Sequence, residues 1–214
     1  RYYKKRTNMK VAIGDSFTYG EELEDRGNAW PSLIGYENHG LRGASNEYTF
    51  RRAVELAPQA THMIVAWSDS GRYELYTQRP INVSERYNHH KGIIQVNPGW
   101  VQMGTWFKEL YSHYSDEEHQ LLRTLSYMVA LQDVLKANNI DYWFCSAFGN
   151  QQLFKKYIDN SKLKPWFDRL NTDKFIGYPS EGFVEWAYSA PHGPNGHPLE
   201  EGHKLIADEI LKHI

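Results

Sequence analysis

MKVAIGDSFTYGEEL, residues 9–23, passes abruptly from an apolar run into Gly14, Asp15 and Ser16. The apolar run, Lys10–Ile13, predicts a buried β-strand that ends at these small residues. In an open sheet of parallel strands, ligands bind at the carboxyl ends of the strands. Ser16 at such an end is either a nucleophile or only part of a strand-to-helix turn with a cap.

The rest of the chain alternates between strand-like and helix-like segments. Buried strands are predicted at Tyr36–His39, Met63–Trp67 and Asp141–Phe148, and a weaker one at Lys174–Ile176. Helices are predicted from a cap at Asn46 to Leu56, from a cap at Asp116 to Asn138, and over Leu199–Ile214. This alternation favours an α/β fold with a mostly parallel sheet of about five strands, covered on both faces.

Size and charge set limits on the class of protein. The chain has 214 residues and a net charge of -2, which favours one domain over residues 9–214 after a short basic tail at 1–8. No general attraction to nucleic acid or to an anionic membrane is expected. Neither a signal peptide nor a membrane-length apolar run is evident. We expect a soluble protein, cytoplasmic by default, with a virion or released protein as the alternative.

Residues 70–115 interrupt the alternation with a polar, aromatic-rich insertion. A segment of this length in a compact domain is usually a lid, a binding surface or a small packed unit. Its aromatic residues either pack the insertion itself or form a stacking platform for a sugar. Trp100 and Trp106 are the candidates for such a platform.

A serine hydroxyl is a weak nucleophile until a base removes its proton. The segment PHGPNGHPLEEGHKLIADEI supplies a candidate base, His197, immediately before Pro198. Proline is favoured in the first turn of a helix, so His197 is expected on the loop that enters the last helix. That loop lies at the same sheet edge as Ser16 if the preceding strand is parallel.

Two motifs carry a family resemblance. GDSFTYGEEL near the start and NGHPLEEGHKLIADEI near the end resemble the SGNH/GDSL hydrolase superfamily. The resemblance implies a flavodoxin-like, three-layer α/β/α fold and the hydrolysis or transfer of an acyl ester, without metal or cofactor. It implies Ser16 as nucleophile, His197 as base, and the N–H groups of Ser16 and Gly43 as oxyanion donors.

The chain departs from the family pattern at two positions. Ser68 stands where the family has an asparagine, so a shorter hydroxyl is expected as the third oxyanion donor. Pro194 stands where an aspartate usually precedes the histidine by three residues. Asn195 is the nearest polar side chain, and an amide can orient an imidazole but cannot stabilise its charge as a carboxylate does. We therefore expect a Ser–His dyad, or a triad whose acid comes from elsewhere.

Other polar residues have both a functional and a structural interpretation. His192 and Glu185 are weak candidates for the missing third member of the triad. Asp69, Arg72 and Glu74 follow the third strand and could bind a substrate carboxylate or sugar hydroxyls, or form an internal Arg–acid pair that braces the loop. The remaining His and Cys residues are expected to have no role in the site. His89 and His90 are expected in a solvated loop, His203 on a helix surface and Cys145 in the core.

These observations favour a serine esterase or acyltransferase acting on a small acyl ester, such as an acetyl group on a carbohydrate. The alternative is a binding or structural protein of virion type that keeps the fold without activity. A nucleotide-binding protein is disfavoured because the Gly-rich phosphate-binding motifs are absent from the sequence.

Overall fold

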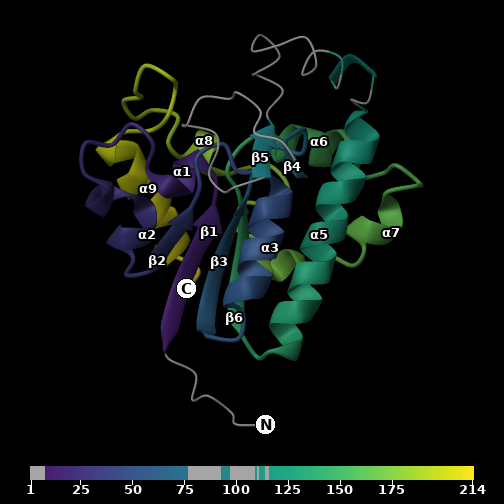
Figure 1. Ribbon diagram of the computed structural model, residues 1–214, viewed down its shortest axis with the longest axis horizontal. Coiled ribbons are helices and arrows are strands. Elements are labelled where there is room, and N and C mark those ends of the chain that lie inside the picture. Colours follow the sequence, from purple (N-terminus) through teal and green to yellow (C-terminus); the bar gives the residue numbers. More distant parts are fainter. Residues whose placement is uncertain (1–7, 77–92, 97–108, 110, 114–115) are drawn as a thin grey trace.

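A parallel β-sheet forms the centre of the computed structural model, which describes residues 8–76, 93–96, 109, 111–113 and 116–214 (Figure 1). In these residues the sheet has four strands, namely β1 (Met9–Gly14), β2 (Glu37–Gly40), β3 (Ala60–Trp67) and β6 (Asp141–Ser146). Their order is β2-β1-β3-β6, and every neighbouring pair is parallel. The predicted α/β fold with a mostly parallel sheet is confirmed.

The expected fifth strand, Lys174–Ile176, is not formed. A 3-10 helix, η4 (Thr172–Lys174), occupies its first residue, and only Phe175 makes a parallel bridge, to Phe144. Gly177, with φ 77°, then turns the chain away from the sheet. One bridge between two turns leaves no room for a strand, so the sheet has four strands rather than five.

Alternate strand residues face two separate apolar layers, as the period of two along a strand requires. Val11 and Ile13 contact the layer formed with α3 (Asn46–Leu56), α5 (Glu117–Ala137), α6 (Asn150–Tyr157) and α7 (Lys164–Phe167). Ala12 contacts the opposite layer, formed with α2 (Trp30–Leu33), α8 (Phe183–Trp186) and α9 (Glu200–Leu211). Figure 1 shows these helices on the two faces of the sheet. The result is a three-layer α/β/α sandwich.

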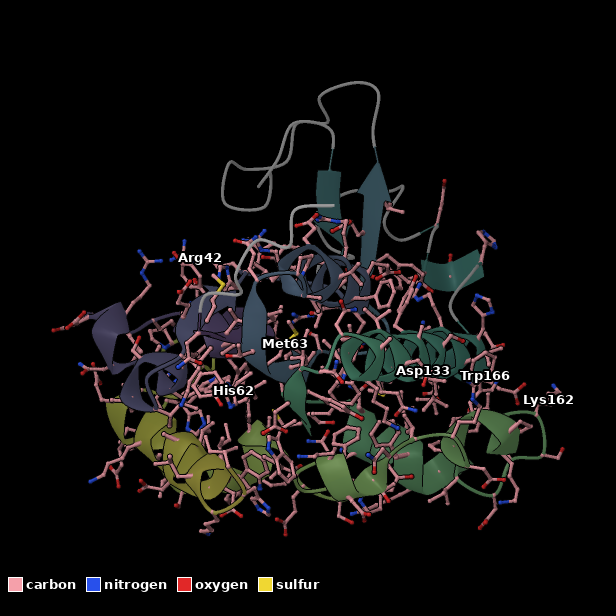
Figure 2. The ribbon with its side chains drawn as sticks, turned by 90° about the horizontal axis from the view of Figure 1, so that it is seen from below. Arg42, His62, Met63, Asp133, Lys162 and Trp166 are labelled. Atoms are coloured by element: carbon pink, nitrogen blue, oxygen red, sulfur yellow. The ribbon has the colours of Figure 1, made fainter. Side chains whose placement is uncertain are left out.

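Figure 2, turned by 90° from Figure 1, shows side chains in the interior and at the surface of the molecule. Met63, on the central strand β3, is 1% exposed, whereas Lys162 lies at the periphery. Cys145 on β6 is fully buried, as expected from its apolar neighbours. Burial raises the pKa of its thiol well above the ordinary range. Such a thiol does not act as a nucleophile at neutral pH.

The helix limits follow from capping. Asp116 caps α5 by accepting a hydrogen bond from Glu118 N at 3.1 Å, as predicted. The inward residues of α5 are all fully buried: Leu121, Leu125, Met128, Leu131 and Leu135. The cap of α3 is Ser45 rather than the predicted Asn46, because the Ser45 hydroxyl accepts from Tyr48 N. Asn46 is the first helical residue, and its side-chain amide bonds instead to the backbone of Ser68, directly after β3.

Part of the expected insertion forms a two-stranded antiparallel hairpin of β4 (Tyr73–Tyr76) and β5 (Ile93–Val96). The tail at 1–7 lies outside the described residues, as do Trp100, Trp106, His89 and His90. Among the helices that the structure does describe, none combines the length and apolar character needed to cross a membrane.

Candidate active site

Ser16 begins the short helix α1 (Ser16–Tyr19), directly after strand β1. Asp15 caps this helix, because its Oδ1 accepts a hydrogen bond from Phe17 N at 3.0 Å. Gly14 makes the sharp exit from the strand possible, since a Cβ there would lie 2.3 Å from Thr18 Oγ1. The turn therefore fixes the Ser16 hydroxyl at the carboxyl end of the sheet.

His197 lies on the loop between α8 and α9 and reaches Ser16 across 181 residues of sequence. Its Nε2 is 3.0 Å from Ser16 Oγ. The ring packs beside Phe17, with the two ring centroids 5.5 Å apart. A backbone bridge between His192 and Pro198 closes the loop that carries the imidazole. The predicted nucleophile and base thus meet at hydrogen-bond distance.

Glu22 occupies the other side of the imidazole, with its Oε2 3.0 Å from His197 Nδ1. A carboxylate can only accept, so the imidazole proton is assigned to Nδ1 and Nε2 accepts from the Ser16 hydroxyl. Burial disfavours the carboxylate, but hydrogen bonds from Asn195 and His197 outweigh it and lower the pKa of Glu22 below its ordinary value. An ionised carboxylate therefore holds the imidazole of His197.

The structure places Glu22, and not Asn195, beside the imidazole Nδ1. The Asn195 amide instead donates to Glu22 Oε1 at 2.8 Å. Glu185 on α8, considered as the acid, instead accepts from Gln151 Nε2 on α6. Glu22 comes from the loop after the nucleophile, where no spacing rule relative to His197 applies. The sequence feature that could have pointed to Glu22 is its position, six residues after Ser16 and two after Gly20.

The expected oxyanion donors differ in their availability. Gly43 has φ 67° and is buried, and its N–H donates to no acceptor among the described residues. Both donors of Ser68 are already engaged inside the protein. Its hydroxyl donates to Asp15 Oδ2 at 2.6 Å, and its N–H donates to Asn46 Oδ1 at 2.8 Å. Ser68 therefore supports Asp15 and does not offer a free donor.

Arg72 adopts the bracing arrangement rather than an open one. It is 6% exposed, and its Nη1 lies 3.1 Å from Ala44 O and 3.4 Å from Asp15 Oδ2. Asp69 accepts from Gly71 N at 2.6 Å, which closes a local turn. Glu74 accepts from Nε and Nη2 of Arg51, each at 3.1 Å. The candidate substrate-binding residues that the structure describes are thus engaged with the protein itself.

His203 is fully buried, which corrects the expected surface position. It shares the inward face of α9 with Ile206 and Ile210, three and seven residues further on. Its Nδ1 accepts a hydrogen bond from Trp30 N at 3.2 Å. Burial, with a smaller repulsion from His197, lowers the pKa of His203 to about 4. The side chain is therefore a neutral core residue at physiological pH.

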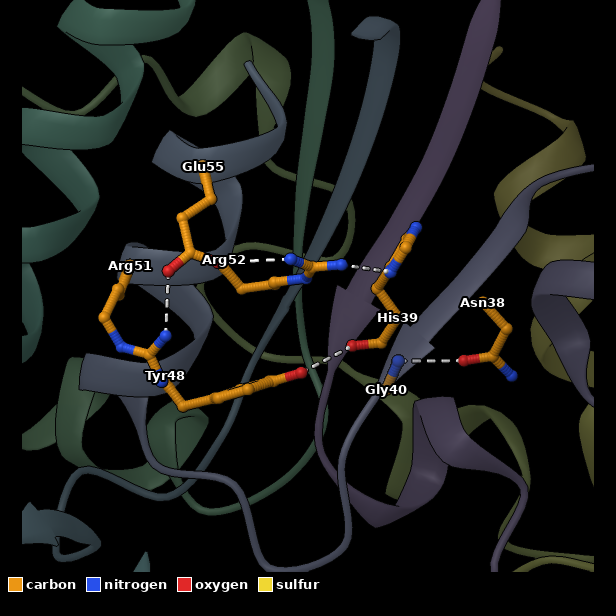
Figure 3. A pocket seen from close by; sticks show the side chains of 7 residues that line it. All are labelled: Asn38, His39, Gly40, Tyr48, Arg51, Arg52 and Glu55. Atoms are coloured by element: carbon orange, nitrogen blue, oxygen red, sulfur yellow. Dashed lines mark hydrogen bonds and ion pairs between the residues drawn. The ribbon is translucent and has the colours of Figure 1, made fainter. Parts of the chain in front are cut away.

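A separate polar cavity of about 610 Å³ lies between the edge strand β2 and α3 (Figure 3). Its lining comprises Asn38, His39, Gly40, Tyr48, Arg51, Arg52 and Glu55. Glu55 accepts from both arginines, and Arg52 also donates to His39 Nδ1 at 3.2 Å. Hydrogen bonds thus join Arg51, Arg52 and Glu55 to one another and to His39, and the lining contains no serine or cysteine. Within the described residues, no cluster of three or more His, Cys, Asp or Glu is placed to hold a metal ion.

Comparison with known proteins gives similarity in structure alone. No family model and no curated protein sequence matches the chain. The solved structure of TesA matches with a TM-score of 0.53 and 11% identity, over 96% of this chain and 97% of that one. A candidate acylhydrolase from Bacteroides fragilis matches with a TM-score of 0.50 and 14% identity, over 99% of this chain and 89% of that one.

A two-domain esterase active on acetylated mannans also matches, with a TM-score of 0.50 and 13% identity. The match covers 96% of this chain but 48% of the esterase. At such identities the likeness concerns the fold. The chain shares its α/β/α fold with these solved acylhydrolase and esterase structures, which supports the resemblance that the two sequence motifs carry.

Proposed function

We propose that the protein is a serine esterase or acyltransferase that uses a Ser16–His197–Glu22 triad. One observation carries the proposal, namely the continuous chain of hydrogen bonds through the three side chains. Ser16 Oγ lies 3.0 Å from His197 Nε2, and His197 Nδ1 lies 3.0 Å from Glu22 Oε2. This is the nucleophile–base–acid order that activates a serine.

In the proposed reaction, Ser16 Oγ attacks the ester carbonyl carbon while its proton passes to His197 Nε2. The carbonyl π electrons move to the oxygen, forming a tetrahedral oxyanion. When that intermediate collapses, the bond to the alcohol oxygen breaks and Nε2 protonates the leaving alcohol. Water, or a second alcohol in a transfer reaction, repeats these steps on the acyl-enzyme and regenerates the Ser16 hydroxyl.

Each protein group in this mechanism has a separate electrostatic task. Ionised Glu22 stabilises the imidazolium that forms when His197 takes the proton. The N–H groups of Ser16 and Gly43 are the proposed oxyanion donors, and one such donor typically contributes about 3 kcal/mol. Ser68 is left out of the donor set, because its hydroxyl and its N–H are already engaged.

The proposed substrate is a small acyl ester, such as an acetyl group on a carbohydrate. This part rests on the aromatic-rich sequence of the insertion and on the similarity to an esterase of acetylated mannans. Replacing Trp100 or Trp106 by Ala tests the carbohydrate part. Turnover of acetylated oligosaccharides should fall while turnover of p-nitrophenyl acetate stays the same. Variants that turn over acetylated oligosaccharides as fast as the wild type does would remove the carbohydrate from the proposal.

The function itself is tested by ester turnover. The purified protein is assayed with p-nitrophenyl acetate and acetylated oligosaccharides beside Ser16→Ala. Turnover by the wild type that disappears in Ser16→Ala supports the proposal. Equal rates in both proteins would favour the alternative, a binding or structural protein that keeps this fold without activity.

A further inference from the structure

We infer that Asn195 is a positioning residue for Glu22: its side-chain amide holds Oε1 and its backbone N–H spans both carboxylate oxygens, so that Oε2 faces His197. This inference rests on the proposed function. Glu22 is the acid of the candidate triad, and Asn195 touches none of the reacting atoms. Its role is therefore to orient the acid.

The contacts divide the carboxylate into two ends. Glu22 Oε1 lies 2.8 Å from Asn195 Nδ2, and Asn195 N lies 3.0 Å from Oε1 and 3.1 Å from Oε2. Glu22 Oε2 lies 3.0 Å from His197 Nδ1 and 3.2 Å from His197 N. A free glutamate side chain rotates about several bonds, so anchoring Oε1 limits where Oε2 can lie. The side-chain amide of Asn195 supplies that anchor, while its backbone N–H is shared between the two oxygens.

The turn is shaped around the carboxylate. A Cβ on Gly193 would lie 2.7 Å from both Cδ and Oε2 of Glu22, so only glycine leaves room for the acid. Gly193 N also donates to His197 O at 2.8 Å, which closes the turn beneath the imidazole. Glu22 itself has φ 70°, a conformation uncommon for a residue with a side chain. Such backbone strain persists only where the surroundings hold it, and it is frequent at functional sites.

The chemistry of the amide allows positioning to be separated from a purely structural role. Asn195 is exposed, so its replacement opens no cavity in the core. Aspartate has the same shape and suits the same turns, but its ionised side chain accepts without donating. In the Asn195→Asp variant the new carboxylate would repel Glu22 at the distance now spanned by a hydrogen bond. A structural role tolerates aspartate better than alanine, whereas a positioning role tolerates it less.

The test compares Asn195→Ala and Asn195→Asp with the wild type, using p-nitrophenyl acetate as substrate. His192→Ala is the matched control, because His192 is exposed on the same loop and is not among the described residues whose hydrogen bonds lower the pKa of Glu22. A hydrogen bond to a charged group corresponds to about 10- to 100-fold in rate. We expect kcat to fall about 10-fold in Asn195→Ala and about 100-fold in Asn195→Asp, with KM unchanged. His192→Ala should keep the wild-type kcat.

A double-mutant cycle tests whether Asn195 acts through Glu22. In a Glu22→Gln background, neither Asn195 substitution should lower kcat further. An Asn195→Asp variant as active as the wild type would overturn the inference. Equal losses from Asn195→Ala with and without Glu22 would overturn it as well. Wild-type turnover that is the same in Ser16→Ala would instead contradict the proposed function.

A readout that needs no turnover keeps the two claims separate. The His197 Nδ1–H proton should give a low-field NMR signal that disappears in His197→Ala. We expect Asn195→Asp to remove or shift this signal and His192→Ala to leave it. An unchanged signal in Asn195→Asp would overturn the positioning role whether or not the protein is an esterase.

Discussion

Glu22 Oε2 lies 3.0 Å from His197 Nδ1, although the two residues are 175 positions apart in the sequence. Glu22, the candidate acid, follows Ser16 by six residues, and His197, the candidate base, comes from the far end of the chain. The short helix α1 ends at Gly20, whose φ of 82° lets the chain reverse toward the imidazole. The short segment formed by α1 and the turn after it thus carries both the candidate nucleophile and the candidate acid.

Glu22→Gln should lower kcat about 10³-fold or more, because an amide cannot stabilise the imidazolium and can favour the wrong tautomer. KM should change little, since Glu22 is not expected to touch the substrate. Glu24→Gln is the matched control, because Glu24 is exposed on the same loop. Steady-state measurements of kcat and KM for the two variants test this prediction. Equal activity of both variants would assign the orienting role to another group.

Ser68→Ala should act on stability more than on rate. Asp15 is fully buried, and the Ser68 hydroxyl donates to it at 2.6 Å. Leaving a buried acceptor short of a donor costs about 1–3 kcal/mol. Urea unfolding should register that loss while kcat falls less than about 10-fold, well below the effect of losing an oxyanion donor. A larger fall in kcat with unchanged stability would return Ser68 to the oxyanion donors.

Arg72→Met should destabilise the protein strongly, because it leaves the Asp15 carboxylate buried without its cation. Breaking a buried ion pair by removing one partner typically costs about 3–5 kcal/mol. Arg52→Met is the comparison, since the Arg52–Glu55 pair is more exposed and pairs of that kind contribute about 1 kcal/mol or less. The free energies of unfolding in urea should differ accordingly. Similar values for the two variants would contradict the bracing role of Arg72.

His203 should make stability depend on pH in the acid range. The buried side chain has a pKa of about 4 in the folded protein, against about 6.5 in an unfolded chain. The unfolded state therefore binds more protons between these values, and stability falls as the pH falls from about 6.5 to 4. The difference corresponds to about 3 kcal/mol at most.

Asn in place of His203 can still accept from Trp30 N but does not titrate in this range. His203→Asn should therefore flatten the curve of unfolding free energy against pH between pH 4 and 6.5. His213→Asn, at a more exposed histidine near the end of the chain, is the control. The same slope in the wild type and in His203→Asn would show that another group causes the acid sensitivity.

The sequence predicted the parts of the fold that depend on local pattern. Apolar runs located β1, β3 and β6, and the Asp116 cap with its inward leucines located α5. It failed at Lys174–Ile176, where a 3-10 turn competes with the sheet for the same residues. It also failed at His203. This polar residue lies on the same buried face of α9 as Ile206 and Ile210.

The site was predictable only where motif and topology coincide. Ser16 and His197 lie in recognisable blocks at sheet-edge loops, and the structure brings them to hydrogen-bond distance. Glu22 belongs to no such block, because its contact with His197 depends on how the chain reverses direction after Gly20. The engagement of Ser68 with Asp15 and Asn46 depends equally on packing between separate loops. Spacing in the sequence carries no information on either contact.

The most direct measurement is intact-mass analysis after treatment with a small fluorophosphonate, which reacts with an activated serine by displacing fluoride. The wild type should carry one adduct, mapped to Ser16, and Ser16→Ala and His197→Ala should carry none. Glu22→Gln should form the adduct far more slowly than Glu24→Gln. An unlabelled wild-type protein, or labelling that persists in His197→Ala, would contradict the claim that His197 and Glu22 activate Ser16.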